Sequence, residues 1–221
     1  MISLGKTCSS HFCSSGSQKR QPEICIAHAY AYGGCTVQDL GYYPFSQEFF
    51  SDLTHYIRSG DFVENMLRDA SDLDEYAFAL GALSHYVGDS VGHHNAINPA
   101  TAISFPKLGR RYGAAVTYDQ SPHAHVRTEL AFNIDQLSKH RLAPGAYLRL
   151  IGLRVPDRLL AQAFAETYSL WLHDVLGLRR SAIRSYRTSV RSILPRFAYA
   201  ETVLHKMTFR QKSRTNRSRF F

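Results

Sequence analysis

The chain has 221 residues, of which 44% are hydrophobic and 20% charged, a balance typical of a globular protein with one sizeable core. It contains no run of about twenty apolar residues, so no transmembrane helix is expected. The formal charge of +8 is unevenly placed, because the segment from Arg179 to Phe221 holds twelve Lys or Arg and one acid. The basic character is therefore a C-terminal feature.

The two ends of the chain differ in composition from its middle. Residues 1–22 are Ser-rich and lack the continuous apolar core of a secretion signal, so we expect disorder there and leave the localisation open. Residues 196–221 are expected to form a solvated basic tail, with nucleic acid or an anionic membrane surface as alternative partners. A helical domain over residues 23–195 is predicted between them. Among the four cysteines, both a Cys25–Cys35 disulfide and free thiols remain open.

Helical spacing of apolar residues recurs along most of the chain, whereas the alternation typical of strands is almost absent. Asp61, with Glu64 three residues on, is read as one helix N-cap, and Ser71 or Asp72 as the next. Loops are expected over 38–44 and 92–99, and a short helix and turn over 105–120. The predicted helices cover residues 24–35, 46–58, a short stretch after Asp61, 72–91, 121–139, 145–153, 157–172 and 179–193. The fold class is therefore all-α, with helices packed around one buried polar cluster.

Two pairs of residues carry the chemistry. His85 is followed four residues later by Asp89, and His125 is followed four residues later by Glu129. On a helix this spacing places both side chains on one face. Imidazole and carboxylate are the ligands that Zn²⁺ takes when thiolates are absent. The apolar surroundings of His85 favour a buried helix, where a shared cation satisfies both groups.

Further candidates lie near these pairs. His93 and His94 follow Asp89, and either one can supply a ligand. Taken alone, His55 is typical of a satisfied core histidine, and Asp39 of a turn residue. Tyr86, Asp52 or Asn95 are expected to orient the imidazoles.

Together these residues resemble the zinc-dependent phospholipase C family, whose structural cousins are the S1/P1 nucleases. The order, spacing and type of residue agree for an Asp and a His sixteen apart, His85 with Asp89, a following His, and His125 with Glu129. Residues 29–34, 38–45 and 52–62 are similar to bacterial proteins that carry zinc-dependent phospholipase C domains. The resemblance covers roughly residues 25–190.

The resemblance implies an all-α fold around a zinc cluster. Asp39, His55, His85 and Asp89 would hold one zinc ion, and Asp39 would also be the general base. A second zinc ion would be held by His93, His125 and Glu129, with Asp89 placed to bridge metals. The family's third zinc is held by an N-terminal Trp and a nearby His, which the segment before Pro22 does not match; the chain's one tryptophan is Trp171. We therefore expect two zinc ions.

Three functions follow as hypotheses. The first is a phosphodiester hydrolase of the phospholipase C type, with metal-activated water attacking a phospholipid or a similar phosphodiester, and with peripheral membrane contact. The second is an S1/P1-like nuclease, which only the basic tail favours. The third is a non-catalytic helical domain that keeps zinc as a structural element.

Overall fold

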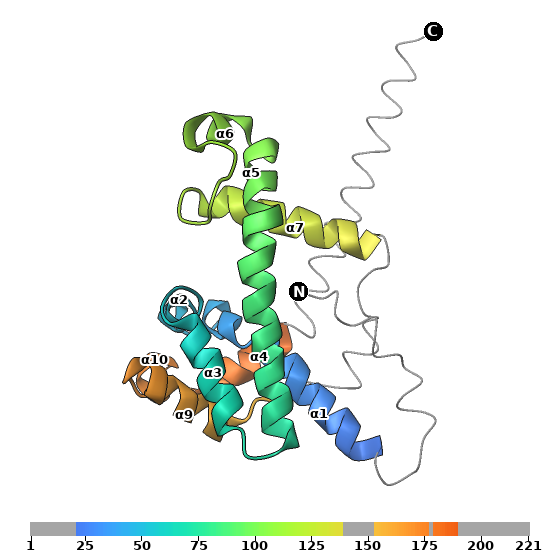
Figure 1. Cartoon of the computed structure of the whole chain (residues 1–221), viewed down its shortest axis with the longest axis vertical. Helices are drawn as coiled ribbons and strands as arrows, with labels where there is room; N and C mark the ends of the chain where they lie inside the picture. Colours follow the sequence, from blue (N-terminus) through green and yellow to red (C-terminus); the bar gives the residue numbers. More distant parts are fainter. Residues whose placement is uncertain (1–20, 139–152, 177–178, 190–221) are drawn as a thin grey trace. The chain divides into compact units, whose positions relative to one another are not determined.

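The structure is a computed structural model that describes residues 21–138, 153–176 and 179–189 (Figure 1). Within these residues the regular structure is helical throughout, which confirms the all-α prediction. The chain divides into two compact units, and the boundary follows Ala96. The first unit comprises the described residues up to Ala96 and those from 153 onward, and the second comprises 97–138. The expected N-terminal segment, the basic tail and the helix over 145–153 lie outside the described residues, apart from the edges of these ranges, and the predicted division into domains stays a prediction.

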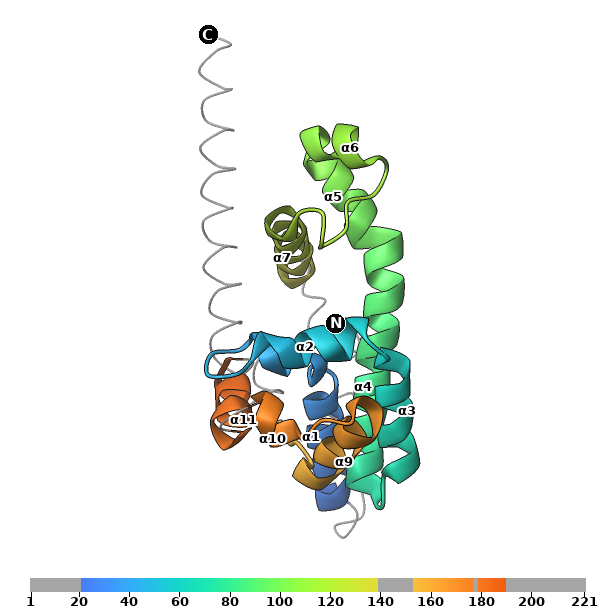
Figure 2. The same ribbon diagram turned by 90° about the vertical axis from the view of Figure 1, so that its left-hand side faces the viewer.

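The first unit is built from helices that the sequence largely anticipates. Its elements in chain order are α1 (Gln21–Gly34), η2 (Gln38–Tyr42), α2 (Glu48–Tyr56), α3 (Ser59–Asp69), α4 (Leu73–Gly92), α9 (Asp157–Tyr168), α10 (Leu172–Leu176) and α11 (Arg179–Thr188). Helix α1 packs along α4, and α3 contacts both α4 and α9 (Figure 2). The segment read as a loop over 38–44 contains the 3-10 helix η2.

Helix α1 approaches α4 closely enough that glycine is required at the contact. A Cβ on Gly34 would lie 1.9 Å from the carbonyl oxygen of Phe78, and one on Gly81 would lie 2.1 Å from that of Ala31. Both distances are far below van der Waals contact, so any side chain at either position would push the two helices apart. The residue after α1, Cys35, is thereby held against α4.

Aromatic rings fix α2 in the first unit. Phe50, Phe62 and Phe164, from α2, α3 and α9, are each fully buried. The Phe50 and Phe164 rings stack at 5.4 Å, and Phe62 meets Phe164 edge-on at 6.3 Å. Each such burial contributes about 1.5–3 kcal/mol relative to exposure. The helix that carries His55 is therefore set by core packing.

Helix α4 begins as predicted, and it leaves several apolar side chains exposed. The side chain of Asp72 accepts a hydrogen bond from the backbone N–H of Glu75, which confirms Asp72 as the N-cap. Leu73 is 61% exposed and Val87 is 47% exposed. The buried face instead comprises Glu75, Phe78, Ala79, Gly81, Ala82 and His85. The small residues on this face allow α1 to pack closely against α4.

The predicted N-cap at Asp61 is wrong. Helix α3 begins at Ser59, after Arg58 in the left-handed conformation with φ of 51°. Asp61 lies in its first turn, where its carboxylate accepts a hydrogen bond from Arg58 Nε at 2.7 Å. The reversal at Arg58 joins α2 to α3 without a longer loop.

The second unit contains α5 (Asn98–Ser104), α6 (Pro106–Tyr112) and α7 (Pro122–Ser138). The loop predicted over 92–99 is wrong, because helical structure continues through the π-helix η3 (His93–Ile97) into α5. Pro99 lies in the first turn of α5, directly after η3. The carbonyl of Asn98 accepts a hydrogen bond from Val116 N at 3.0 Å, which ties the segment before α7 to α5.

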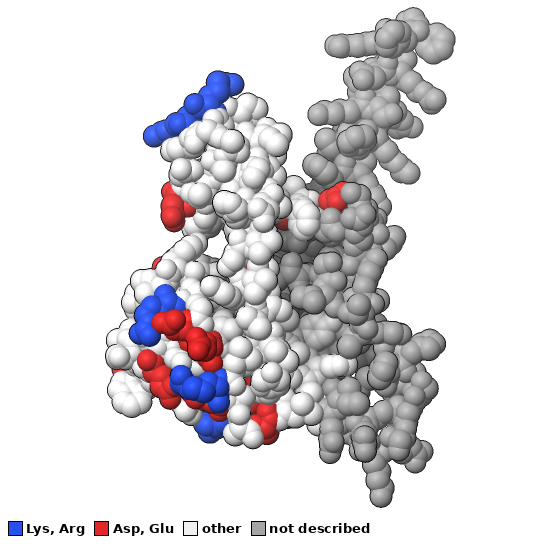
Figure 3. All heavy atoms as spheres, in the orientation of Figure 1, with Lys and Arg blue, Asp and Glu red and all other residues white. Residues whose placement is uncertain are grey.

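On the face drawn in Figure 3, acidic and basic side chains lie side by side over α3 and α9. The contacts responsible include Arg68 with Glu166 and Arg68 with Asp69. None of the helices that the structure describes combines the length and apolar character needed to span a bilayer.

Candidate metal centre

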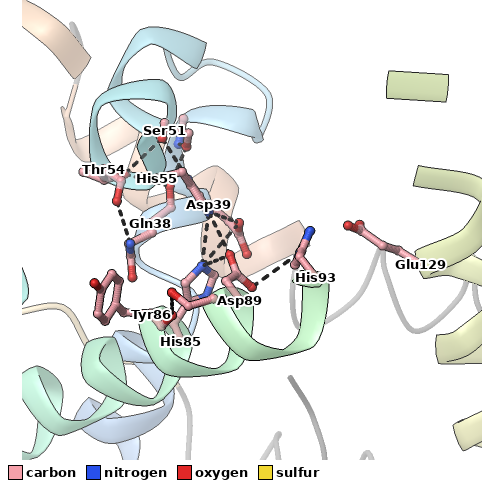
Figure 4. Close-up of polar contacts among 12 residues, drawn as sticks. Gln38, Asp39, Ser51, Thr54, His55, His85, Tyr86, Asp89, His93 and Glu129 are labelled. Carbon is pink, nitrogen blue, oxygen red and sulfur yellow. Dashed lines mark hydrogen bonds and ion pairs between the residues drawn. The ribbon is translucent and has the colours of Figure 1, made fainter. Parts of the chain in front are cut away.

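Four side chains from three elements of the first unit converge on one point (Figure 4). Asp39 comes from η2, His55 from α2, and His85 and Asp89 from α4. His55 Nε2 lies 3.2 Å from His85 Nε2, and both nitrogens face the carboxylates. Asp39 Oδ1 is 3.4 Å from His55 Nε2, and Asp89 Oδ2 is 3.1 Å from His85 Nε2. The ligand atoms of Asp39, His55 and His85 all lie within 4.8 Å of one another.

The other nitrogen of each ring meets a backbone carbonyl. His55 Nδ1 lies 2.8 Å from the carbonyl oxygen of Ser51, and His85 Nδ1 lies 2.9 Å from that of Cys35. A carbonyl only accepts hydrogen bonds, so in each ring Nδ1 carries the proton and donates it. In the neutral imidazole this leaves the Nε2 lone pair free, which is the tautomer that binds a metal.

This arrangement fits a zinc ion. Two Nε2 lone pairs and two carboxylates face one another, and among neutral rings and ionised acids no proton lies between them. Such a group of electron-pair donors is stable only around a cation, either a proton or a metal. The donor set of imidazole and carboxylate is one that Zn²⁺ accepts, and the carbonyl partners provide the outer shell that such sites normally have.

Without a metal, the same crowding retains protons. Burial alone would lower the pKa of His55, but hydrogen bonds to Asp39 and Asp89 outweigh it and raise the pKa to about 10. The pKa of His85 is raised in the same way, chiefly because its hydrogen bond to Asp89 overcomes burial. For Asp89, burial would raise the pKa, but the two imidazoles hold it well below its usual range. The cluster therefore binds positive charge in both cases, as a zinc ion or, without metal, as protons.

A polar clamp made by Gln38, Ser51 and Thr54 holds η2 against α2. Ser51 Oγ donates to the carbonyl oxygen of Gln38 at 2.6 Å and accepts from Gly41 N at 2.9 Å. Gln38 Nε2 donates to the carbonyl oxygen of Thr54 at 2.6 Å. All three side chains are buried, so the clamp fixes Asp39 relative to His55.

The sequence did not reveal the groups that orient the imidazoles of His55 and His85. Of the residues expected to orient the imidazoles, Asp52 and Asn95 are exposed, and the Tyr86 hydroxyl lies beside Gly60. The carbonyls of Ser51 and Cys35 take that role, and main-chain atoms leave no signature in residue type. The one local signal was that Ser51 precedes His55 by four residues, which places its carbonyl one helical turn before the ring.

Asp89 has a second oxygen that points toward another histidine. Its Oδ1 lies 3.8 Å from His93 Nε2, while its Oδ2 faces His55 and His85. His94 is exposed. Between the two adjacent histidines, the geometry around Asp89 therefore favours His93.

The second unit holds the other predicted pair. On α7, His125 Nδ1 lies 3.1 Å from Glu129 Oε1, as the spacing of four residues predicts. The His125 ring is fully buried, and Tyr118 packs against it edge-on with ring centroids 5.8 Å apart. His93 belongs to the first unit, so its grouping with His125 and Glu129 stays a prediction.

Comparison with known proteins places this geometry in context. A family model described as zinc dependent phospholipase C matches residues 6–177 of the chain. No curated protein and no solved structure matches it. The match covers every candidate ligand in both units.

Proposed function

Because the chain belongs to the zinc dependent phospholipase C family, we propose that it hydrolyses the phosphodiester of a phospholipid with zinc-activated water. Membership of this family supports a zinc-dependent phosphodiester hydrolase, and a phospholipid is the substrate that we propose. The observation that carries it is the cluster of Asp39, His55, His85 and Asp89, whose ring tautomers leave both Nε2 lone pairs facing the carboxylates.

In this proposal, each predicted ligand has a defined role. Asp39, His55, His85 and Asp89 hold one zinc ion. A second zinc ion is held by the remaining three ligands, His93, His125 and Glu129. The facing of Asp89 Oδ1 toward His93 supports a bridging role for Asp89 between the two ions.

Bound zinc supplies a water of lowered pKa and neutralises negative charge on the phosphoryl oxygens. The protein supplies the remaining functions. The side chain of Asp39 is 27% exposed, so its carboxylate meets solvent, which supports a role as the acceptor of the attacking water's proton. His85, fully buried, stays outside the proton transfer and holds its Nε2 toward the cluster.

Two partly exposed tyrosine rings lie beside His55. The Tyr42 ring lies 5.6 Å from the His55 ring, and the Tyr56 ring lies 6.1 Å from it. Both tyrosines are about half exposed, and Phe45, in the turn after η2, is 82% exposed. Apolar rings beside a phosphodiester site favour a substrate that has an apolar portion, as a phospholipid does.

The test is an assay of the zinc-loaded full chain on a short-chain phosphatidylcholine and on single-stranded DNA. We expect release of the phosphorylated head group, little cleavage of DNA, and a loss of about 10²–10⁴-fold in kcat for Asp39→Asn. The matched control is Asp52→Asn, an exposed acid on α2, which should retain activity. Cleavage of DNA alone would favour the nuclease hypothesis, and bound zinc without turnover on either substrate would favour the non-catalytic one.

A further inference from the structure

We propose that Asn98 is a positioning residue for the second metal centre, because its side-chain oxygen determines which ring nitrogen of His125 carries the lone pair that binds metal. The inference rests on the proposed function, in which His125 and Glu129 are metal ligands. It adds a residue that the family's ligand pattern does not contain.

The contact lies wholly within the second unit. His125 Nε2 is 2.9 Å from Asn98 Oδ1, while Nδ1 on the other side of the ring is 3.1 Å from Glu129 Oε1. Asn98 is half-buried at the start of α5, and its own carbonyl is held by Val116 N. The His125 ring is fully buried and packed edge-on by Tyr118, so it cannot turn over without disturbing its neighbours.

Two tautomers of His125 are chemically consistent with these distances, and the orientation of the Asn98 amide decides between them. With Oδ1 facing the ring, Nε2 must donate, so Nδ1 carries a lone pair that faces the Glu129 carboxylate. Two acceptors 3.1 Å apart then need a cation between them. With the amide turned over, Nε2 would accept from Asn98, and Nδ1–H would donate to Glu129 and leave no metal ligand.

The structure assigns the first arrangement. It also makes the second centre the reverse of the first, in which Nδ1 is held by a carbonyl and Nε2 is left free. In the second centre, Nε2 meets the side-chain oxygen of Asn98, and Nδ1 directs its lone pair toward Glu129. Unlike the carbonyls of Ser51 and Cys35, the side-chain oxygen of Asn98 can be removed by substitution.

The experiment titrates the metal-free full chain with Co²⁺ and follows the visible absorption of each bound equivalent. Wild type should bind two equivalents. Asn98→Leu should weaken the second by about 10- to 100-fold and leave the first unchanged. Asn98→Asp retains an acceptor but has no donor, so it should bind both equivalents within a few-fold of wild type. Asn95→Leu, an exposed asparagine in η3, is the matched control.

The outcomes separate the two proposals. Fewer than two equivalents in wild type would overturn the ligand assignment, and Asn98 with it. Two equivalents in wild type with an unaffected Asn98→Leu would overturn the role of Asn98 alone. If Asn98→Asp weakened the second equivalent as strongly as Asn98→Leu, Asn98 would be a donor and the tautomer reversed. The ¹⁵N shifts of the His125 ring in unsubstituted protein give the same answer if a variant fails to fold, because they must show the proton on Nε2.

Discussion

Each unit holds a histidine that is followed four residues later by a carboxylate, yet the two units orient their imidazoles differently. In the first unit, His55 and His85 come from different helices, and each ring is held by a main-chain carbonyl. In the second, His125 and Glu129 share α7, and the ring meets the side chain of Asn98. A carbonyl comes with the fold and survives substitution of its own residue, whereas an amide side chain does not. Metal affinity in the first unit should therefore depend on helix packing, and in the second on one residue.

The largest expected effect comes from removing a ligand in the first unit. His85→Ala deletes a fully buried imidazole and should lower kcat/KM by about 10³-fold or more, because the loss of metal stabilisation costs several kcal/mol. Elemental analysis should show about one zinc ion fewer per chain. His123→Ala, an exposed histidine on α7, is the control. Unchanged zinc content in His85→Ala would contradict the assignment of the first cluster.

The pH dependence of zinc binding distinguishes the first cluster from an ordinary solvated site. In metal-free protein the pKa of His55 is raised from 6.5 to about 10, so the ring is protonated at pH 7. Zinc binds the neutral ring, so binding at pH 7 should release about one proton from His55, and affinity should rise about tenfold per pH unit up to pH 10. Calorimetry in buffers of different ionisation enthalpy measures this release. Binding without proton release would contradict the protonated state of the cluster.

The same pKa shift has a consequence for the metal-free fold. A raised folded-state pKa contributes stability that is fully present below the unfolded value of 6.5. That contribution is lost as pH rises through about 10. Chelator-treated protein should therefore lose stability across this window, and zinc should offset the loss, which thermal unfolding with and without chelator measures.

A smaller effect is expected from the clamp in the first unit. Ser51→Ala removes the hydroxyl that joins Gln38 to Gly41 but keeps the carbonyl that holds His55. The loss of these two buried hydrogen bonds should cost about 1–3 kcal/mol of unfolding free energy. Zinc affinity should fall by less than about tenfold, a smaller loss than for Asn98→Leu. Ser90→Ala, which removes one helical side-chain bond on exposed α4 surface, is the control.

A loss of zinc affinity in Ser51→Ala as large as that in Asn98→Leu would contradict the comparison. It would show that rings held by main-chain carbonyls are as sensitive to substitution as the ring held by Asn98. Denaturant unfolding and competition with a chromophoric chelator measure the two quantities separately.

The sequence predicted the ligands better than their supports. The spacing of four in His85–Asp89 and His125–Glu129 predicted their pairing, and the Asp72 cap predicted the start of α4. The carbonyl partners and the contact with Asn98 left no local pattern, because they depend on residues 27 to 50 positions away or on main-chain atoms. The continuation of the helix through η3 was missed for another reason, since Gly, Asn and Pro together are typical of loops.

The glycine pair between α1 and α4 supports the metal site although neither glycine belongs to it. Gly81 lies one turn before His85 on the same helix, and the room that it leaves for α1 sets where the Cys35 carbonyl ends. A single methyl group there would wedge the helices apart and take the proton acceptor away from the His85 ring. Substitution of Gly81 or Gly34 should therefore lower zinc binding. In a mutational screen for metal retention, these two glycines should be as sensitive as the ligands themselves.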